Sequence, residues 1–301
     1  MKLAHIINPV KVPATSELFV AQPITFESIR AAKAFTKNID VELYTVCYPE
    51  DKEIIPSFFT QLPELTRSVL DFGKFSKPKK LPLINDVLQA VYKASDAEYL
   101  IYTNMDISLM PQFYEVAGGM LKESHDALLI NRRGLSTKYK SVDELPAMYS
   151  DLGVPHPGFD CFVFKRELLN KFILENICIG VAFIEVTMVH NLIAFAENLK
   201  VVEDGHLTFH IGTEVMPPLD SEFYSYNRNE YEQKIYPRLK PLLDIRKFPY
   251  SQLPLYKRML KWVLNPVFRT HQVSEMEGKS LGRRLKFKID GLRFSLLNRI
   301  K

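Results

Sequence analysis

The stretch Glu98-Tyr-Leu-Ile-Tyr-Thr-Asn-Met-Asp-Ile-Ser-Leu-Met110 predicts how the rest of the chain is organised. It opens as an apolar, β-rich run and then places three polar side chains, Thr103, Asn104 and Asp106, where the apolar run ends. In an open α/β sheet, ligands gather at the carboxyl ends of the strands. These side chains are therefore candidates for a functional site, and Asp106 is the first among them.

Apolar runs with strand character alternate with helical patterns on both sides of this stretch. The predicted strands cover residues 3–7, 41–46, 65–72, 99–102, 127–130, 156–164 and 207–211. The predicted helices fall within residues 26–35, 84–91, 113–121 and 186–196. This alternation predicts an α/β fold in which a mostly parallel central sheet has helices on both faces.

The composition changes near residue 223. Residues 1–222 are predicted to form a catalytic domain, and residues 223–301 a Tyr- and Pro-rich connector followed by a basic, amphipathic helical extension. From residue 255 onward, twelve Lys and Arg stand against three acids, whereas the whole chain has a net charge of only +4. We expect this C-terminal extension to contact an anionic membrane surface, although its apolar stripes would equally suit the core of a subdomain.

Several classes of protein are excluded by what the sequence lacks. It has no Gly-x-Gly-x-x-Gly, no Walker loop and no Gly-x-Ser-x-Gly, so it is not predicted to be a dinucleotide dehydrogenase, a P-loop NTPase or a serine hydrolase. No apolar stretch approaches the ~20 residues of a membrane-spanning helix, and the amino terminus is a poor signal peptide. We expect a cytoplasmic protein, peripheral at most to the inner face of the membrane.

The order of these features resembles the GT-A glycosyltransferases, the nucleotide-diphospho-sugar transferases of family-two type. After β-α-β units comes a strand ending in Tyr-Thr-Asn-Met-Asp-Ile, residues 102–107, where that family carries its Asp-x-Asp motif. An acceptor-like segment follows at 156–164, then a helix-borne carboxylate, and then a late histidine in Leu-Thr-Phe-His-Ile-Gly, residues 207–212. The resemblance covers residues 1–215. It implies an inverting transferase of glycan biosynthesis, moving a sugar from a nucleotide-diphosphate donor to a glycan or glycolipid acceptor.

The resemblance also implies roles for particular residues. Glu185 would be the catalytic base that removes the proton of the acceptor hydroxyl, with Asp160 as its substitute. The acceptor-binding residues would be His156, Gly158 and Phe159. The residues that bind the donor nucleotide and its diphosphate would be Asn8, Lys80, Thr103, Asn104, Asp106 and Arg132.

A divalent cation would offset the charge of the donor diphosphate. The resemblance implies Mn²⁺ or Mg²⁺ at Asp106, joined by His210. Asn104, however, stands where the family has the first acid of its motif, and it offers only a neutral carbonyl oxygen. Without a metal, the lysines of residues 73–82 and Arg132 or Arg133 would carry out the same neutralisation.

Each candidate also has a structural alternative. Asp106 would cap a turn after a strand, Asp160 would cap the turn at Gly158, and Glu185 would favour a helix start through the macrodipole. His206 and His210 lie ~13 Å apart on an extended segment, so at most one of them is a ligand. The functional alternatives are an α/β nucleotidyltransferase and a non-catalytic module that binds a glycan or nucleotide. No nucleic-acid partner is expected, because the apolar stripes of the extension do not suit one.

Overall fold

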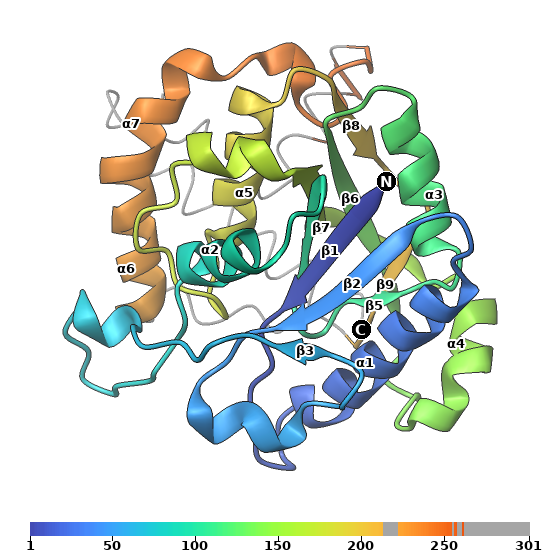
Figure 1. Ribbon diagram of the computed structural model, residues 1–301. Coiled ribbons are helices and arrows are strands. Elements are labelled where there is room, and N and C mark those ends of the chain that lie inside the picture. The colour runs from blue at the N-terminus through green and yellow to red at the C-terminus, as the bar shows by residue number, and fades with distance from the viewer. Residues whose placement is uncertain (213–221, 255, 258–260, 262–301) are drawn as a thin grey trace. The chain divides into compact units, whose positions relative to one another are not determined.

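The computed structural model of the protein describes residues 1–212, 222–254, 256, 257 and 261. The chain divides into two compact units, Met1–Ser251 and Gln252–Lys301. The first unit carries all of the helices and strands given below (Figure 1). The predicted helical extension at the C-terminus lies almost wholly outside the described residues.

A single nine-stranded sheet forms the centre of the first unit, with strand order β3-β2-β1-β4-β7-β6-β9-β5 and with β8 also paired to β6. Its strands are β1 Lys2–Ile7, β2 Asp40–Thr45, β3 Thr60–Gln61, β4 Tyr99–Thr103, β5 Ser108–Leu109, β6 Ala127–Leu135, β7 Val154–Lys165, β8 Leu199–Val202 and β9 Thr208–Ile211. Five neighbouring pairs are parallel; β7 is antiparallel to both β4 and β6, and β5 is antiparallel to β9. The predicted mostly parallel sheet is confirmed.

Helices cover both sides of the sheet (Figure 1). They are α1 Leu18–Phe35, α2 Ile84–Ala94, α3 Phe113–Lys122, α4 Leu145–Ser150, α5 Ile184–Phe195, α6 Glu222–Asn229 and α7 Tyr236–Leu239. Helices α1 and α3 share one apolar core with strand residues such as Leu3 and Ile101, while α2 packs on β1 and β4 and α5 packs on β7. In α2, the four residues that predicted the helix, Ile84, Val87, Leu88 and Val91, are the buried ones. Among the described residues, no helix is long and apolar enough to cross a bilayer.

Short helical turns complete the chain. The 3-10 turns are Pro49–Ile54, Val69–Asp71, Val142–Glu144, Arg166–Lys171, Lys240–Leu242 and Ile245–Lys247, and Glu230–Ile235 is a π-helix. The predicted strand at 65–72 is wrong. Ser68 and Asp71 form a reciprocal capping box there, which turns the chain into a 3-10 helix, and the strand of this region is β3.

Residues 223–251, which the sequence assigns to the connector, belong to the first unit. The side chain of Asn227 is fully buried, accepts a hydrogen bond from the backbone amide of Cys178 at 3.0 Å and donates one to its carbonyl oxygen at 2.9 Å. Tyr231, also fully buried, is hydrogen-bonded through its hydroxyl to Nδ1 of His190 on α5. Polar and aromatic side chains with buried partners thus extend the unit to Ser251, beyond the expected boundary after residue 222.

Candidate functional site

The predicted site residues gather at one edge of the sheet. Strands β1, β2 and β4 are parallel and end together. Strand β6 runs in the same direction, because β7 lies antiparallel between it and β4, and β9 is parallel to β6. The chain following β4, the carboxyl halves of β6 and β9 and the start of β7 therefore meet at this carboxyl edge, where open α/β sheets bind ligands.

Asp106 and His210 face each other at this edge. Oδ2 of Asp106 lies 3.2 Å from Nε2 of His210, and the Asp106 side chain is 32% exposed. His210 is held on β9 opposite Gly134 of β6. Burial alone would raise the pKa of Asp106, but the hydrogen bond and charge of His210, together with the charge of Arg132, outweigh it and hold this pKa below its usual range.

The other nitrogen of His210 restricts what can lie between these two side chains. Nδ1 is 3.3 Å from the carbonyl oxygen of Gly212, which can only accept a hydrogen bond, so Nδ1 carries a proton. In the neutral ring, Nε2 then presents a lone pair toward the Asp106 carboxylate. Either a second proton on His210 or a cation between the two groups removes that conflict.

The pair fits a divalent cation. An octahedral ion such as Mg²⁺ binds its ligands at about 2.0–2.1 Å, which places neighbouring ligand atoms about 3 Å apart, close to the separation of the Asp106 and His210 atoms. In the part of the chain that the structure describes, no three His, Cys, Asp or Glu side chains are grouped to hold a metal. Asp106 and His210 would thus supply two ligands, and the remainder would come from diphosphate oxygens or water.

Asp160 has a different environment. It is buried, forms an ion pair with Nη1 of the buried Arg132, and accepts a hydrogen bond from Nδ2 of Asn104 at 3.1 Å. Asn104 in turn accepts a hydrogen bond from the hydroxyl of Tyr102 at 3.0 Å. A carboxylate held by a permanent cation is a weak proton acceptor, which speaks against Asp160 as a general base.

Glu185 lies against the segment predicted to bind the acceptor. It is in the first turn of α5, and its Oε1 accepts a hydrogen bond from the backbone amide of Phe159 at 2.7 Å. A Cβ on Gly158 would lie 3.1 Å from the same oxygen. His156 completes the turn by accepting a hydrogen bond at Nδ1 from the amide of Gly158 at 3.0 Å. The structure therefore brings Glu185 to the turn formed by His156, Gly158 and Phe159.

The backbone before Glu185 is strained. Phe183, which directly precedes α5, has φ of 83°, in the left-handed region. For a residue with a large side chain this conformation costs on the order of 1–3 kcal/mol and persists only where the surroundings hold it. Phe183 is buried, with rings of Tyr224 and Tyr231 packed against it at 5.4 and 5.7 Å between centroids. Packing from α6 and the π-helix thus fixes the turn that orients Glu185.

Three predicted donor residues are engaged within the protein. Thr103 is fully buried, with its hydroxyl 2.9 Å from Nε2 of His5. The side chain of Asn8 donates to the carbonyl oxygen of Val46 at 2.6 Å and joins the ends of β1 and β2. Lys80 pairs with Glu50 at 2.9 Å. Their hydrogen-bonding groups are thus used within the fold, and Thr103 and Asn8 hold strand ends at this edge.

Sequence reasoning missed two residues that hold the edge together. Asn131 accepts the backbone amide of Asp204 at 2.8 Å and donates to the carbonyl oxygen of His156 at 3.2 Å, thereby joining β6 to the loop before β9 and to the start of β7. His5 lies between Thr103 and the hydroxyl of Tyr114, 2.7 Å from its Nδ1. The available signal was a polar side chain inside or directly after an apolar strand.

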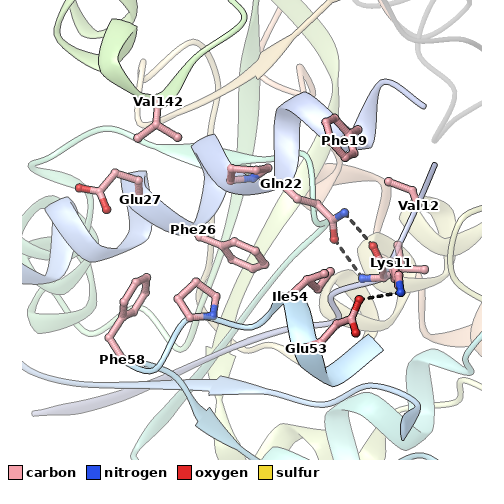
Figure 2. A pocket seen from close by; sticks show the side chains of 13 residues that line it. Lys11, Val12, Phe19, Gln22, Phe26, Glu27, Glu53, Ile54, Phe58 and Val142 are labelled. Atoms are coloured by element: carbon pink, nitrogen blue, oxygen red, sulfur yellow. Dashed lines mark hydrogen bonds and ion pairs between the residues drawn. The ribbon is translucent and has the colours of Figure 1, made fainter. Parts of the chain in front are cut away.

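A cavity of about 570 Å³ lies away from these residues, between α1 and the Pro49–Ile54 turn (Figure 2). Its walls are mainly apolar, with Phe19, Phe26 and Phe58 among them, and an ion pair of Lys11 with Glu53 at 2.6 Å lies along it. None of the predicted site residues lines it. The candidate site is therefore defined by its side-chain chemistry and by the carboxyl edge of the sheet.

Neither a protein-family model nor a curated protein matches this sequence. The chain is similar to solved structures that include TarS 1–349 of S. aureus in complex with UDP-GlcNAc, at 12% identity, a TM-score of 0.47 and coverage of 88% of this chain and 79% of that one. For glucosyl-3-phosphoglycerate synthase from Mycobacterium tuberculosis in complex with UDP, the identity is 16% and the TM-score 0.46, with coverage of 79% of this chain and 80% of that one. For the mannosyltransferase PcManGT from Pyrobaculum calidifontis in complex with GDP-Man and Mn²⁺, the identity is 14% and the TM-score 0.44, with coverage of 98% of this chain and 80% of that one.

Proposed function

We propose that this protein is an inverting glycosyltransferase that moves a sugar from a nucleotide-diphosphate donor to a glycan or glycolipid acceptor. The observation that carries the proposal is the pair of Asp106 and His210, 3.2 Å apart at the carboxyl edge of a mostly parallel sheet. A carboxylate and an imidazole at this place suit a divalent cation that offsets the charge of a leaving diphosphate. The reaction is proposed to take place in the cytoplasm, at the inner face of the membrane.

The donor side would be built around Asp106. When bound, Mn²⁺ or Mg²⁺ at Asp106 and His210 would neutralise the diphosphate as it departs with the bonding electron pair. Arg132 is tied to Asp160, so its charge acts on the site through that pair and not as a separate clamp. Asn104 is hydrogen-bonded to Asp160 and Tyr102, which supports a positioning role in place of the acid of the family motif.

The acceptor side would be built around Glu185. As the acceptor hydroxyl oxygen attacks the anomeric carbon, Glu185 would accept the hydroxyl proton, and the bond between that carbon and the diphosphate oxygen would break on the opposite side. The backbone at Gly158 and Phe159 supports this assignment, because it holds Oε1 of Glu185 in place. Asp160, already paired with Arg132, is a poorer candidate for the base.

One experiment tests both which nucleotide the protein binds and whether binding depends on a metal. Thermal shifts of the full chain would be measured with UDP, GDP, CMP and dTDP, each with and without Mn²⁺. We expect one nucleoside diphosphate to stabilise the protein, more strongly with Mn²⁺, and Asp106→Ala to remove the Mn²⁺-dependent part. Asp40→Asn is the matched control, because Asp40 is an exposed carboxylate at the opposite edge, where β2 begins.

Turnover separates the alternatives. Release of nucleoside diphosphate from a nucleotide sugar, lowered ~10²–10⁴-fold in Glu185→Gln with nucleotide binding retained, is the expected result. Pyrophosphate release from a nucleoside triphosphate would identify a nucleotidyltransferase instead. Nucleotide binding without turnover of any nucleotide sugar, in the presence of glycan and glycolipid acceptors, would identify a binding module.

A further inference from the structure

The loop between β3 and α2 has two sets of side chains that point in different directions. Residues 70–80, here called the basic loop, project beside α6 (Figure 1). The ring of Phe75 is stacked on Phe223 of α6, with centroids 4.2 Å apart, and also contacts Tyr226. The backbone amide and hydroxyl of Ser76 both donate to Glu222, at 2.7 and 3.0 Å. The basic loop is therefore fixed to α6 by its centre.

The other apolar side chains of the basic loop are left outside. Leu70 is 38% and Phe72 42% exposed, although Phe75, three residues further on, is packed inward. The guanidinium of Arg67 lies 5.6 Å from the centroid of the Phe72 ring. The loop is fixed to α6, and its Phe75 already packs in an apolar cluster. Leu70 and Phe72 are therefore exposed in the folded loop itself.

The basic loop also carries exposed lysines. Lys74, Lys77 and Lys79 are exposed, and within the described part of the chain the structure gives them no ion pair. Lys80, the next lysine, does have an acidic partner in Glu50. The basic loop thus carries three exposed lysines without a described ion pair, two exposed large apolar side chains, and one acidic residue, Asp71.

We propose that the basic loop docks the protein on an anionic lipid bilayer. Lysines close to an anionic membrane surface each contribute about 1 kcal/mol, and apolar side chains beside them can enter the interface between headgroups and acyl chains. A nucleotide or a soluble polyanion would use the charges but leave Leu70 and Phe72 in water. This surface is distinct from the C-terminal extension, whose basic residues follow position 255 in the sequence.

Sedimentation of the full chain with lipid vesicles tests the proposal without any donor sugar, so its outcome is independent of the proposed transfer reaction. The vesicles are phosphatidylcholine alone or phosphatidylcholine mixed with phosphatidylglycerol. We expect binding to the anionic vesicles only. Lys74→Gln/Lys77→Gln/Lys79→Gln should lower the partition coefficient ~100-fold, since each lysine contributes about fivefold.

The matched control removes the same charge elsewhere. Lys93, Lys171 and Lys200 are exposed and scattered over α2, the Arg166–Lys171 turn and β8. Their triple change to Gln should leave most of the binding in place. The C-terminal extension is present in both variants, so the difference between them reports the basic loop alone.

The apolar contribution is tested separately. Leu70→Ser/Phe72→Ser keeps every charge and should lower the binding that persists at high salt, because added salt screens the lysines but leaves interfacial apolar contact. Equal partitioning of the loop triple and the control triple would overturn the proposal. So would full retention of binding by the Leu70/Phe72 variant at high salt, or capture of the wild-type chain by heparin with no binding to anionic vesicles.

Discussion

Asp106 and Asp160 are two carboxylates at the same edge of the same sheet, and their surroundings give them opposite properties. Asp160 is 7% exposed and paired with Arg132, a cation that does not titrate in proteins. The Asp106 side chain is 32% exposed and faces His210, whose Nε2 can carry a proton, a metal or neither. The residue type alone therefore does not assign a role. Burial and the kind of partner separate a structural anion from one available to a ligand.

The difference also bears on how the site is assembled. Asn104 donates to Asp160, and Asp106 follows two residues later, so the two carboxylates are joined through one short segment after β4. The Arg132–Asp160 pair holds this segment through the hydrogen bond from Asn104. A neutral Asn in place of an acid next to Asp160 avoids placing a third negative charge beside the other two. This is a physical reason for the departure from Asp-x-Asp at position 104.

The largest expected effect comes from removing the cation of the buried pair. Arg132→Met leaves Asp160 buried without its charge partner, and we expect the free energy of unfolding at neutral pH to fall by ~3–5 kcal/mol. Urea denaturation measures it. The control is Arg30→Met, because Arg30 and Glu27 form an exposed pair whose loss should cost ~1 kcal/mol or less. If the two substitutions lowered the free energy of unfolding by the same amount, Asp160 would not depend on Arg132 as a buried structural carboxylate does.

The second prediction concerns the open carboxylate. His210→Ala removes one side of the Asp106 pair, and we expect the Mn²⁺-dependent part of nucleotide affinity to fall ~10–100-fold, with the metal-free affinity unchanged. Titration calorimetry with the preferred nucleoside diphosphate, with and without Mn²⁺, measures both. An equal loss of nucleotide affinity with and without Mn²⁺ would show that His210 acts through the protein scaffold. Asp106 and Asp160 would then differ only in how far they are exposed.

Much of the fold was predictable because its signals are local. The period of Ile84, Val87, Leu88 and Val91 predicted α2, and the apolar run before Thr103 predicted β4 and the place where it ends. Residues 65–72 misled because apolar side chains favoured a strand, whereas the Ser68–Asp71 capping box set the backbone. In the predicted connector, the Tyr and Asn side chains are polar in sequence, but Asn227 and Tyr231 have buried partners in the structure.

The sequence nominated the candidate site residues and one pairing that the structure contains, Asp106 with His210, but not the pairing of Asp160. Asp106 was nominated from its place after a strand, and Glu185 and His210 from the resemblance. The partner of Asp160 is Arg132 on β6. Which residue of β6 lies next to Asp160 depends on the shifts of register between β6 and β7 near Ile130 and Asn131. Such shifts leave no mark in the periodicity of the sequence. For the same reason, nothing in the pattern distinguished the buried carboxylate, Asp160, from the half-buried one, Asp106.

The third prediction concerns His5, which is hydrogen-bonded to Thr103 before the Asp106 segment, and its variable is pH. Burial lowers the pKa of His5 from 6.5 to about 3, and both ring nitrogens have neutral partners, Thr103 and Tyr114. Between these pH values the unfolded chain binds a proton at His5 that the folded chain does not. The contribution of His5 to stability is therefore complete above pH 6.5 and declines by ~1.4 kcal/mol for each pH unit below it.

His5→Gln isolates this contribution, since an amide can bond the same two hydroxyls but does not titrate. Denaturation midpoints of wild type and variant should run parallel above pH 6.5 and converge below it, with the variant losing less stability on acidification. Parallel curves down to pH 4 would mean that His5 accepts a proton inside the fold as readily as in water. In that case a neutral imidazole at His5 would not be what holds Thr103, and the segment that carries Asp106 would lack this support.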